Sequence, residues 1–225
     1  PAKNWDIFNL KGIKTGITIC EDIWAALSKD NSRFLDQRRY SLDPVKILKE
    51  KGAELIINIS ASPYIKGKRQ IRMDMLRNIA RENNTSIVYV NQVGGNDSLI
   101  FDGNSFCVNK KGELYAHSKG FEEDLLFVDY DSGGDIFPEV DDIDDIRRGL
   151  VLGLKDYMSK SGFKKAVLGL SGGIDSALTA VIACQALGSE NVFGITMPSE
   201  YSSHGSVEDS YALAKNLSMR IETIP

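Results

Sequence analysis

Short runs of β-branched and apolar residues alternate with segments of helical periodicity over the first 131 residues. Between Gln70 and Glu82, apolar side chains recur every three or four positions, which predicts a helix with one buried face. Strands are predicted for three β-branched runs, at residues 12–20, 54–60 and 86–91. This alternation of strand and helix predicts a layered α/β or α+β body.

Polar residues between these runs indicate where the elements begin and end. Asp43 is suited to cap a helix that starts at Pro44, and Gly52 follows the expected end of that helix. Further along, "NSFCVNKKGELYAHS" contains two short strand patterns on either side of residues 109–112, which predicts a β-hairpin. The run "LLFVDYD" at residues 125–131 ends this part of the chain.

An acidic segment follows. From Phe121 to Ile146 there are eleven acidic residues and neither Lys nor Arg. Because such a composition hydrates well and packs poorly, residues 132–146 are expected to form a linker. The predicted division of the chain is therefore 1–131, 132–146 and 147–225.

A different pattern begins after the linker. A helix is expected to end near Ser161, and strands and helices then alternate as far as the final run "RIETI". Two earlier strands are predicted at residues 165–170 and 191–197. A βαβ series of this kind forms a parallel sheet.

Overall charge and cysteine content narrow the classes of function. The chain has 27 Lys and Arg against 31 Asp and Glu, and its net charge of −4 provides no attraction to nucleic acid or to an anionic membrane. A small-molecule partner is therefore expected. The three cysteines are odd in number and far apart, which argues against a disulfide framework and favours the reducing cytoplasm.

Neither a membrane span nor a signal peptide can be found in the sequence. The chain starts without Met, and both of its ends are expected to be cut.

The stretch "GLSGGIDSA", residues 169–177, lies between a predicted strand and a predicted helix. Two adjacent glycines at such a junction leave backbone N–H groups free to bind an anion at the positive end of the helix. Ser171 and Ser176 can add hydroxyl donors to phosphate oxygens. The stretch lacks the Lys-Ser/Thr pair of a Walker A loop, so it does not indicate phosphoryl transfer. Asp175 is suited to bind Mg²⁺ beside the phosphates, although an Asp in a first helical turn also stabilises the helix dipole without any ligand.

After its hydrophobic strand, "SGGIDS" resembles the pyrophosphate loop of the N-type ATP pyrophosphatases. These enzymes cleave ATP between the α and β phosphates to adenylylate a substrate, and they include NAD, GMP, asparagine and argininosuccinate synthetases and tRNA-modifying ligases. The run "GITMPSEYSSHGSVEDS" at residues 194–210 is similar to the segment after the second strand of NAD synthetases. A polar turn before a capped helix is the simpler interpretation of residues 198–203. The resemblance implies ATP contacts from Gly169, Leu170, Ser171, Gly172, Gly173, Ile174, Asp175 and Ser176.

The stretch "TICEDIW" places Cys20 at the end of a predicted strand, immediately before Glu21. A lone cysteine is more often a small buried apolar residue than a nucleophile. At a strand end, however, a thiol is presented to a crevice, where a nearby cation or base would favour its thiolate form. Nothing close in the sequence supplies that group.

From about residue 5 to residue 131 the chain is similar to the glutamine amidohydrolase domain of the nitrilase superfamily. The resemblance is carried by Cys-Glu-Asp-X-Trp, "NISASPYIKGKRQIR" and "NQVGGNDSLIFDGNSF". It implies that Cys20 is the nucleophile, and that the Glu and Lys that complete the catalytic set of the family lie upstream of this sequence. It also implies that Glu21, Ser62 and Lys68 contact the glutamine substrate, whereas a turn Ser and a solvated Lys are the simpler interpretations of the last two. Without the upstream Glu and Lys, the 225 residues alone are expected to be inactive.

Together the resemblances imply an α/β fold of two parts. The first is the C-terminal part of an α-β-β-α nitrilase-type sandwich. The second is the start of a parallel-sheet pyrophosphate-loop domain, of the adenine nucleotide alpha hydrolase-like kind.

The order of the two parts resembles that of the glutamine-dependent NAD⁺ synthetases. The implied reaction is ATP-dependent amidation of deamido-NAD⁺ through an adenylate, with Mg²⁺ and with ammonia from glutamine hydrolysis. A homo-oligomer joined through the synthetase domain is also implied. Two alternatives stay open: another adenylating amidotransferase of the pyrophosphate-loop superfamily, and a non-catalytic pair of ATP-binding regulatory domains.

Overall fold

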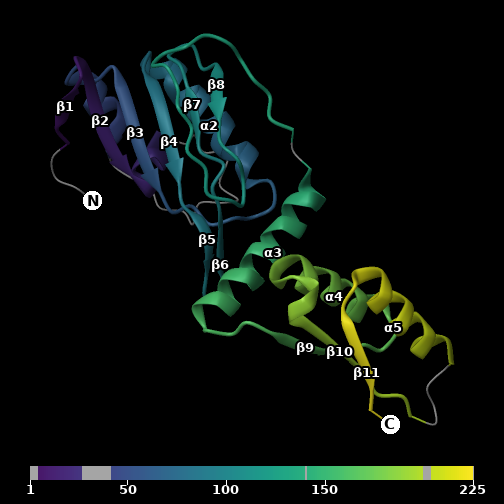
Figure 1. Ribbon diagram of the computed structural model, residues 1–225. Coiled ribbons are helices and arrows are strands. Elements are labelled where there is room, and N and C mark those ends of the chain that lie inside the picture. The colour runs from purple at the N-terminus through teal and green to yellow at the C-terminus, as the bar shows by residue number, and fades with distance from the viewer. Residues whose placement is uncertain (1–4, 27–41, 140, 200–203, 225) are drawn as a thin grey trace. The chain divides into compact units, whose positions relative to one another are not determined.

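The structure is a computed structural model that describes residues 5–26, 42–139, 141–199 and 204–224. The chain divides into two units, here called unit 1 (Pro1–Gly94 and Phe101–Asp142) and unit 2 (Gly95–Ile100 and Ile143–Pro225). Both combine sheets with helices, which confirms the predicted α/β class (Figure 1). The domain boundaries taken from the sequence stay a prediction.

The main sheet of unit 1 has six strands in the order β1-β2-β3-β4-β7-β8. Its centre is parallel, and the outer pairs are antiparallel. The three β-branched runs form the parallel centre, and the predicted hairpin joins β7 to β8, as expected from their patterns. The bounds are β1 (Ile7–Leu10), β2 (Ile13–Ile19), β3 (Leu55–Ser60), β4 (Ser86–Asn91), β7 (Phe106–Val108) and β8 (Leu114–His117).

Two helices pack on one face of this sheet. The first, α1 (Pro44–Glu50), begins as predicted, because Asp43 Oδ1 accepts hydrogen bonds from the N–H groups of Val45 and Lys46 at 3.0 and 3.2 Å. The second, α2 (Lys68–Asn83), lies behind the strands in Figure 1. Side chains from both helices and from the sheet form one core, which includes Val45, Leu48, Ile56, Met73, Leu76, Ile79, Ile87, Tyr89, Phe106 and Leu114.

The opposite face of the sheet carries exposed apolar side chains. They come from alternate positions of the three parallel strands, so they all point away from the helices. In an α-β-β-α sandwich a second sheet covers such a face, and the pattern therefore agrees with the nitrilase-type fold. The most exposed of these side chains are Ile17, Ile19, Ile59 and Val90.

A buried ion pair joins α2 to the end of β6 (Leu99–Asp102). Arg72 Nη1 and Nη2 donate to the two carboxylate oxygens of Asp102 at 3.0 and 2.5 Å, and each side chain is only 1% exposed. Each ion has a further hydrogen bond: Asn104 Nδ2 donates to Asp102 Oδ2 at 2.8 Å, and Arg72 Nη1 donates to Ser62 O at 3.4 Å. Among the described residues, Arg72 Nε has no hydrogen-bond partner. The bidentate geometry helps to offset the cost of removing two charges from water.

The acidic segment after β8 lies against α2. Its described residues 121–139 form neither helix nor strand. Arg77 Nη2 pairs with Asp135 Oδ2 at 2.6 Å, and Arg69 Nη2 donates to the carbonyl of Glu139 at 2.6 Å. The acidic segment has no Lys or Arg of its own, and arginines of α2 provide these basic partners.

Unit 2 contains a parallel three-stranded sheet in the order β11-β10-β9, which confirms the predicted βαβ series. Its long helix α3 begins at Asp142, inside the predicted linker. Acidic side chains are stabilising near the positive end of a helix, which accounts for this early start. The bounds are α3 (Asp142–Lys160), β9 (Ala166–Gly169), α4 (Ile174–Leu187), β10 (Val192–Thr196), α5 (His204–Leu217) and β11 (Arg220–Thr223).

A two-stranded hairpin, β5 (Val93–Asn96) with β6, has no strand pattern in the sequence. The backbone N–H of Gly95 donates to Asp156 Oδ2 at 2.7 Å, and Lys160 Nζ donates to its carbonyl. A Cβ on Gly95 would lie 3.2 Å from the Cα of Gly153, so the hairpin and α3 approach closely because both residues are glycines. In the described part of the chain, no helix has the length and apolar character that crossing a membrane requires.

Removing one partner of the buried ion pair should destabilise unit 1. We expect Asp102→Ala to lower the free energy of unfolding by about 3–5 kcal/mol, because Arg72 then stays buried without its counter-ion. Urea unfolding followed by tryptophan fluorescence measures this, since Trp5 and Trp24 both lie in the core of unit 1.

The matched control is Asp6→Ala, which removes the partner of Lys51 from an exposed pair in unit 1. Its cost should stay at or below about 1 kcal/mol. Equal losses in the two variants would contradict the importance assigned to the buried pair.

Candidate active sites

Cys20 follows the end of β2 directly and is the first residue of the short 3-10 helix η1 (Cys20–Ala26). Its φ is +49°, in the left-handed region that residues other than glycine rarely adopt. Backbone strain of this kind gathers at functional sites, where the surrounding structure holds it. The side chain is partly exposed, unlike those of Cys107 and Cys184, which are buried.

Lys68 lies at the first position of α2, close to the Cys20 turn. Its ammonium group lies 5.7 Å from the ring centroid of Trp24, and Nζ donates to the carbonyl of Pro63 at 3.2 Å. Burial lowers the pKa of Lys68, and the Arg72 charge lowers it further, whereas the negative charges of Asp102, Cys20 and Glu21 act to raise it. Lys68 is thus within electrostatic reach of Cys20 and Glu21, two of the residues predicted for the same site.

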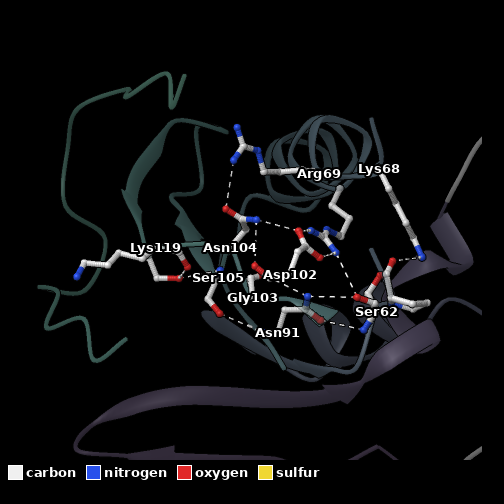
Figure 2. A network of polar contacts seen from close by, with 12 residues as sticks. Ser62, Lys68, Arg69, Asn91, Asp102, Gly103, Asn104, Ser105 and Lys119 are labelled. Atoms are coloured by element: carbon white, nitrogen blue, oxygen red, sulfur yellow. Dashed lines mark hydrogen bonds and ion pairs between the residues drawn. The ribbon is translucent and has the colours of Figure 1, made fainter. Parts of the chain in front are cut away.

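Ser62, two residues after the end of β3, is held by the side chain of Asn91 at the end of β4. Its N–H donates to Asn91 Oδ1 at 2.8 Å, and its carbonyl accepts from Asn91 Nδ2 at 3.3 Å. The same Nδ2 donates to the carbonyl of Gly103 at 3.0 Å, so Asn91 joins two turns (Figure 2). Ser62 therefore has a fixed backbone position next to Pro63, whose carbonyl binds Lys68.

The network around this site contains residues that the sequence analysis did not select. Figure 2 shows Asn91, Asp102 and Asn104 between Ser62 and Arg69. Asp102 also accepts a hydrogen bond from Arg72. Asn91 ends the run "SIVYVN", where a polar side chain follows apolar ones. That change from apolar to polar at a strand end is the signal that could have identified it.

In unit 2, the stretch 169–176 joins β9 to α4, as predicted. Gly172 has a φ of +77°, and Gly173 is the N-cap residue of α4. The two serines close the loop: their hydroxyls lie 3.1 Å apart, Ser171 Oγ accepts from the N–H of Gly173 at 3.2 Å, and Ser176 Oγ donates to the carbonyl of Gly173 at 2.9 Å. The structure therefore brings both predicted hydroxyl groups to one side of the glycine turn.

Gly172 also touches the first turn of α5. A Cβ at this position would lie 2.5 Å from the carbonyl oxygen of Ser206, so only glycine fits. Between the loop and α5 is a pocket of about 420 Å³ whose lining includes Gly172, Gly173, Ser176, Asp209 and Asn216.

Asp175 is exposed in the first turn of α4. Among the described residues there is no group of three or more His, Cys, Asp or Glu side chains placed to hold a metal ion. A single carboxylate beside an anion-binding loop nevertheless matches the way Mg²⁺ is held, because that ion takes one or two carboxylates together with phosphate oxygens and water.

Two known families match consecutive parts of the chain. Carbon-nitrogen hydrolase matches residues 34–134, and NAD synthase matches residues 146–225. Cys20 and Glu21 precede the first of these matches.

Curated relatives align with the chain over its whole length. It is 48% identical to the glutamine-dependent NAD(+) synthetase of Synechocystis sp. and 37% identical to that of Thermotoga maritima, with all of this chain covered in both. The chain covers 40% and 43% of these two proteins, so it spans about two fifths of their length.

Solved structures agree with these matches. The glutamine-dependent NAD⁺ synthetase from Acinetobacter baumannii in complex with adenosine diphosphate is 38% identical, with a TM-score of 0.86 over 99% of this chain and 40% of its own. The glutamine-dependent NAD(+) synthetase from Cytophaga hutchinsonii, at 21% identity, has the same fold over 97% of this chain and 39% of its own, with a TM-score of 0.75. Over its whole length the chain is therefore similar to part of the glutamine-dependent NAD(+) synthetases, and its two parts match the families carbon-nitrogen hydrolase and NAD synthase.

Proposed function

We propose that the whole protein that contains these residues makes NAD⁺ by amidating deamido-NAD⁺, with ATP as the energy source and glutamine as the nitrogen donor. The observation that carries this proposal is the presence of two different sites on one chain. One is a cysteine held in a strained turn beside Glu21 and Lys68. The other is a glycine turn at the start of a helix that follows a parallel strand.

In the first half of the reaction, the Cys20 thiolate attacks the side-chain amide of glutamine. The carbon-nitrogen bond breaks, ammonia leaves, and water then cleaves the glutamyl thioester to give glutamate. In the family, a Glu and a Lys complete the catalytic set with this cysteine, and the proton that the departing ammonia gains is assigned to that set. Ser62 and Glu21 line the glutamine pocket, and the Lys68 ammonium group pairs with the α-carboxylate of the substrate.

In the second half, residues Gly169–Ser176 bind the phosphates of ATP. The carboxylate of deamido-NAD⁺ attacks the α-phosphate and releases pyrophosphate, and ammonia then displaces AMP from the adenylate. We assign Asp175 as a ligand of Mg²⁺, which neutralises charge on the phosphates when it is bound. The serine hydroxyls and the N–H groups of the turn orient the phosphates, so positioning and charge compensation supply the catalysis.

Two further properties belong to this proposal. Ammonia is mostly protonated near neutral pH and is then no nucleophile, so direct transfer between the sites would preserve its reactivity. The division into a glutaminase domain (1–131), a linker (132–146) and a synthetase domain (147–225), with a homo-oligomer formed through the last, also rests on the family resemblance. That a relative binds adenosine diphosphate supports the assignment of ATP.

Cys20→Ala should abolish NAD⁺ synthesis from glutamine and leave synthesis from ammonia largely intact, because only the first site uses the thiol. The matched control is Cys107→Ala, which changes a buried cysteine whose pKa burial raises; it should keep both activities. Assays with each nitrogen donor measure this. Full glutamine-supported activity in Cys20→Ala would exclude Cys20 as the nucleophile.

Asp175→Asn should abolish NAD⁺ formation with either nitrogen donor, because both routes require the adenylate. Glutamine hydrolysis should continue in the same sample. The measurement is release of pyrophosphate and AMP against release of glutamate. A near-native rate of synthesis from ammonia would contradict the assignment of Asp175 as a metal ligand and of residues 169–176 as the ATP site.

The lowered pKa of Lys68 predicts how glutamine binding responds to pH. Below its pKa, Lys68 is charged and binds the substrate carboxylate; as pH rises through that value, the charge is lost at a lower pH than for an ordinary lysine. The KM for glutamine should therefore rise in alkaline solution before pH 10.5, the ordinary lysine value. Lys68→Arg, which stays charged throughout, should flatten the rise. Identical KM profiles for the two proteins would refute the role of Lys68.

A further inference from the structure

The left-handed conformation of Cys20 needs an explanation in the structure around it. A residue with a Cβ is less stable at a φ of +49° than in the extended or right-handed regions. The turn can persist only if its neighbours make that conformation the best available one. The described contacts of residues 18–24 show how this is done.

The first contact lies within the turn. Asp22 Oδ2 accepts a hydrogen bond from the backbone N–H of Ile19 at 3.0 Å. The bond connects the residue before Cys20 to the second residue after it, so it closes a small ring around the nucleophile. Ile19 is the last residue of β2, and the bond thus also marks where the strand must end.

The second contact comes from the neighbouring strand. Asn58 of β3 is fully buried, and its Nδ2 donates to Thr18 Oγ1 at 3.0 Å and to the carbonyl of Cys20 at 3.4 Å. Its Oδ1 accepts from Ser60 Oγ at 2.7 Å. Thr18 and Asn58 are direct partners in the parallel register, which brings the amide beside the end of β2.

A buried amide in an otherwise apolar strand is costly unless its groups are bonded. Here both N–H groups and the carbonyl of the Asn58 side chain have partners, and one of those partners is the carbonyl of the residue in the strained conformation. On the other side of the turn, Ile23 and Trp24 are buried in the core, which holds η1 in place. The turn is therefore restrained before, beside and after Cys20.

We propose that Asp22 and Asn58 are positioning residues that hold the backbone of Cys20 in the left-handed conformation and so aim its thiol at the glutamine amide. This inference rests on the proposed function, since it assumes that Cys20 is the nucleophile. Neither residue touches the substrate. Loss of either one lets residue 20 relax, so the thiol moves away from its attack position while the glutamine contacts of Ser62 and Lys68 stay.

The experiment compares Asp22→Ala, Asp22→Asn and Asn58→Ala in the whole protein that contains these residues. A displaced nucleophile affects the chemical step more than binding, so Asp22→Ala and Asn58→Ala should lower kcat for glutamine hydrolysis by about 10- to 100-fold. The KM for glutamine should stay within about threefold, the size of a modest binding effect. Asp22→Asn keeps a carbonyl acceptor for the N–H of Ile19 and should retain most of kcat.

Thr18→Val is the control for a purely structural effect. It removes one hydrogen bond of Asn58 and leaves the bond to the Cys20 carbonyl, so it should lower the melting temperature with little change in kcat. Ammonia-supported NAD⁺ synthesis, measured on every variant, reports that the rest of the protein is folded. A fall in kcat that follows the melting temperature across all variants, Thr18→Val included, would show a structural role only and overturn the proposal.

Two other outcomes separate the inference from the proposed function. If Asp22→Ala and Asn58→Ala keep kcat within about threefold while Cys20→Ala abolishes glutamine hydrolysis, the positioning roles are wrong and the proposed function stands. If Cys20→Ala itself retains glutamine hydrolysis, the proposed function fails, and the inference fails with it.

Discussion

The geometry of the first site depends on the ion pair between Arg72 and Asp102. Arg72 lies one turn of α2 after Lys68 and donates to the carbonyl of Ser62, while Asp102 ends β6 and accepts from Asn104. A helix, a strand end and two turns that are far apart in the sequence thereby meet at one charge pair. Because two buried charges lose most of their solvation, they are stable only in one geometry, and that geometry is passed on to the residues around them.

The same pair also sets the electrostatics of the site. Arg72 lowers the pKa of Lys68, whereas Asp102 raises it, and burial is the largest effect. His117, on β8, is held neutral by burial and by Arg69 and Arg72, which lower its pKa to about 4. The polar region beneath the site thus contains charges that compensate each other. Lys68 lies at its edge, and we assign its ammonium group to binding the substrate carboxylate.

Regular elements were predictable from the sequence because their patterns are local. The parallel strands are β-branched runs, and α1 has its cap and its first-turn Pro in consecutive positions. The β5–β6 hairpin could not be predicted, since "VGGN" has no alternation and is shaped instead by its close approach to α3. The start of α3 within the acidic segment was also missed. An acidic composition indicates good hydration, but it does not show at which residue a helix begins with carboxylates near its positive end.

The candidate site residues also divide into those that have a local signal in the sequence and those that have none. The glycine loop and the cysteine at the strand end could be selected because each combines an unusual residue type with a strand boundary. Asn58 could not, because it is a single polar residue in a β-branched run, and Arg72 could not, because it is one of many polar residues on α2. Their importance comes from partners 30 and 40 positions away, and strand register and helix packing decide those contacts.

The fit between Gly172 and Ser206 has a consequence for the order in which this turn is completed as the protein is made. The glycine turn is shaped on one side by the first turn of α5, which follows it by 34 residues and approaches too closely for a methyl group. On the ribosome, β9, the loop and α4 leave the exit tunnel before that surface exists. Until α5 has emerged and docked, the loop lacks one wall, so in a nascent chain at that stage nothing from α5 restricts residue 172 to glycine.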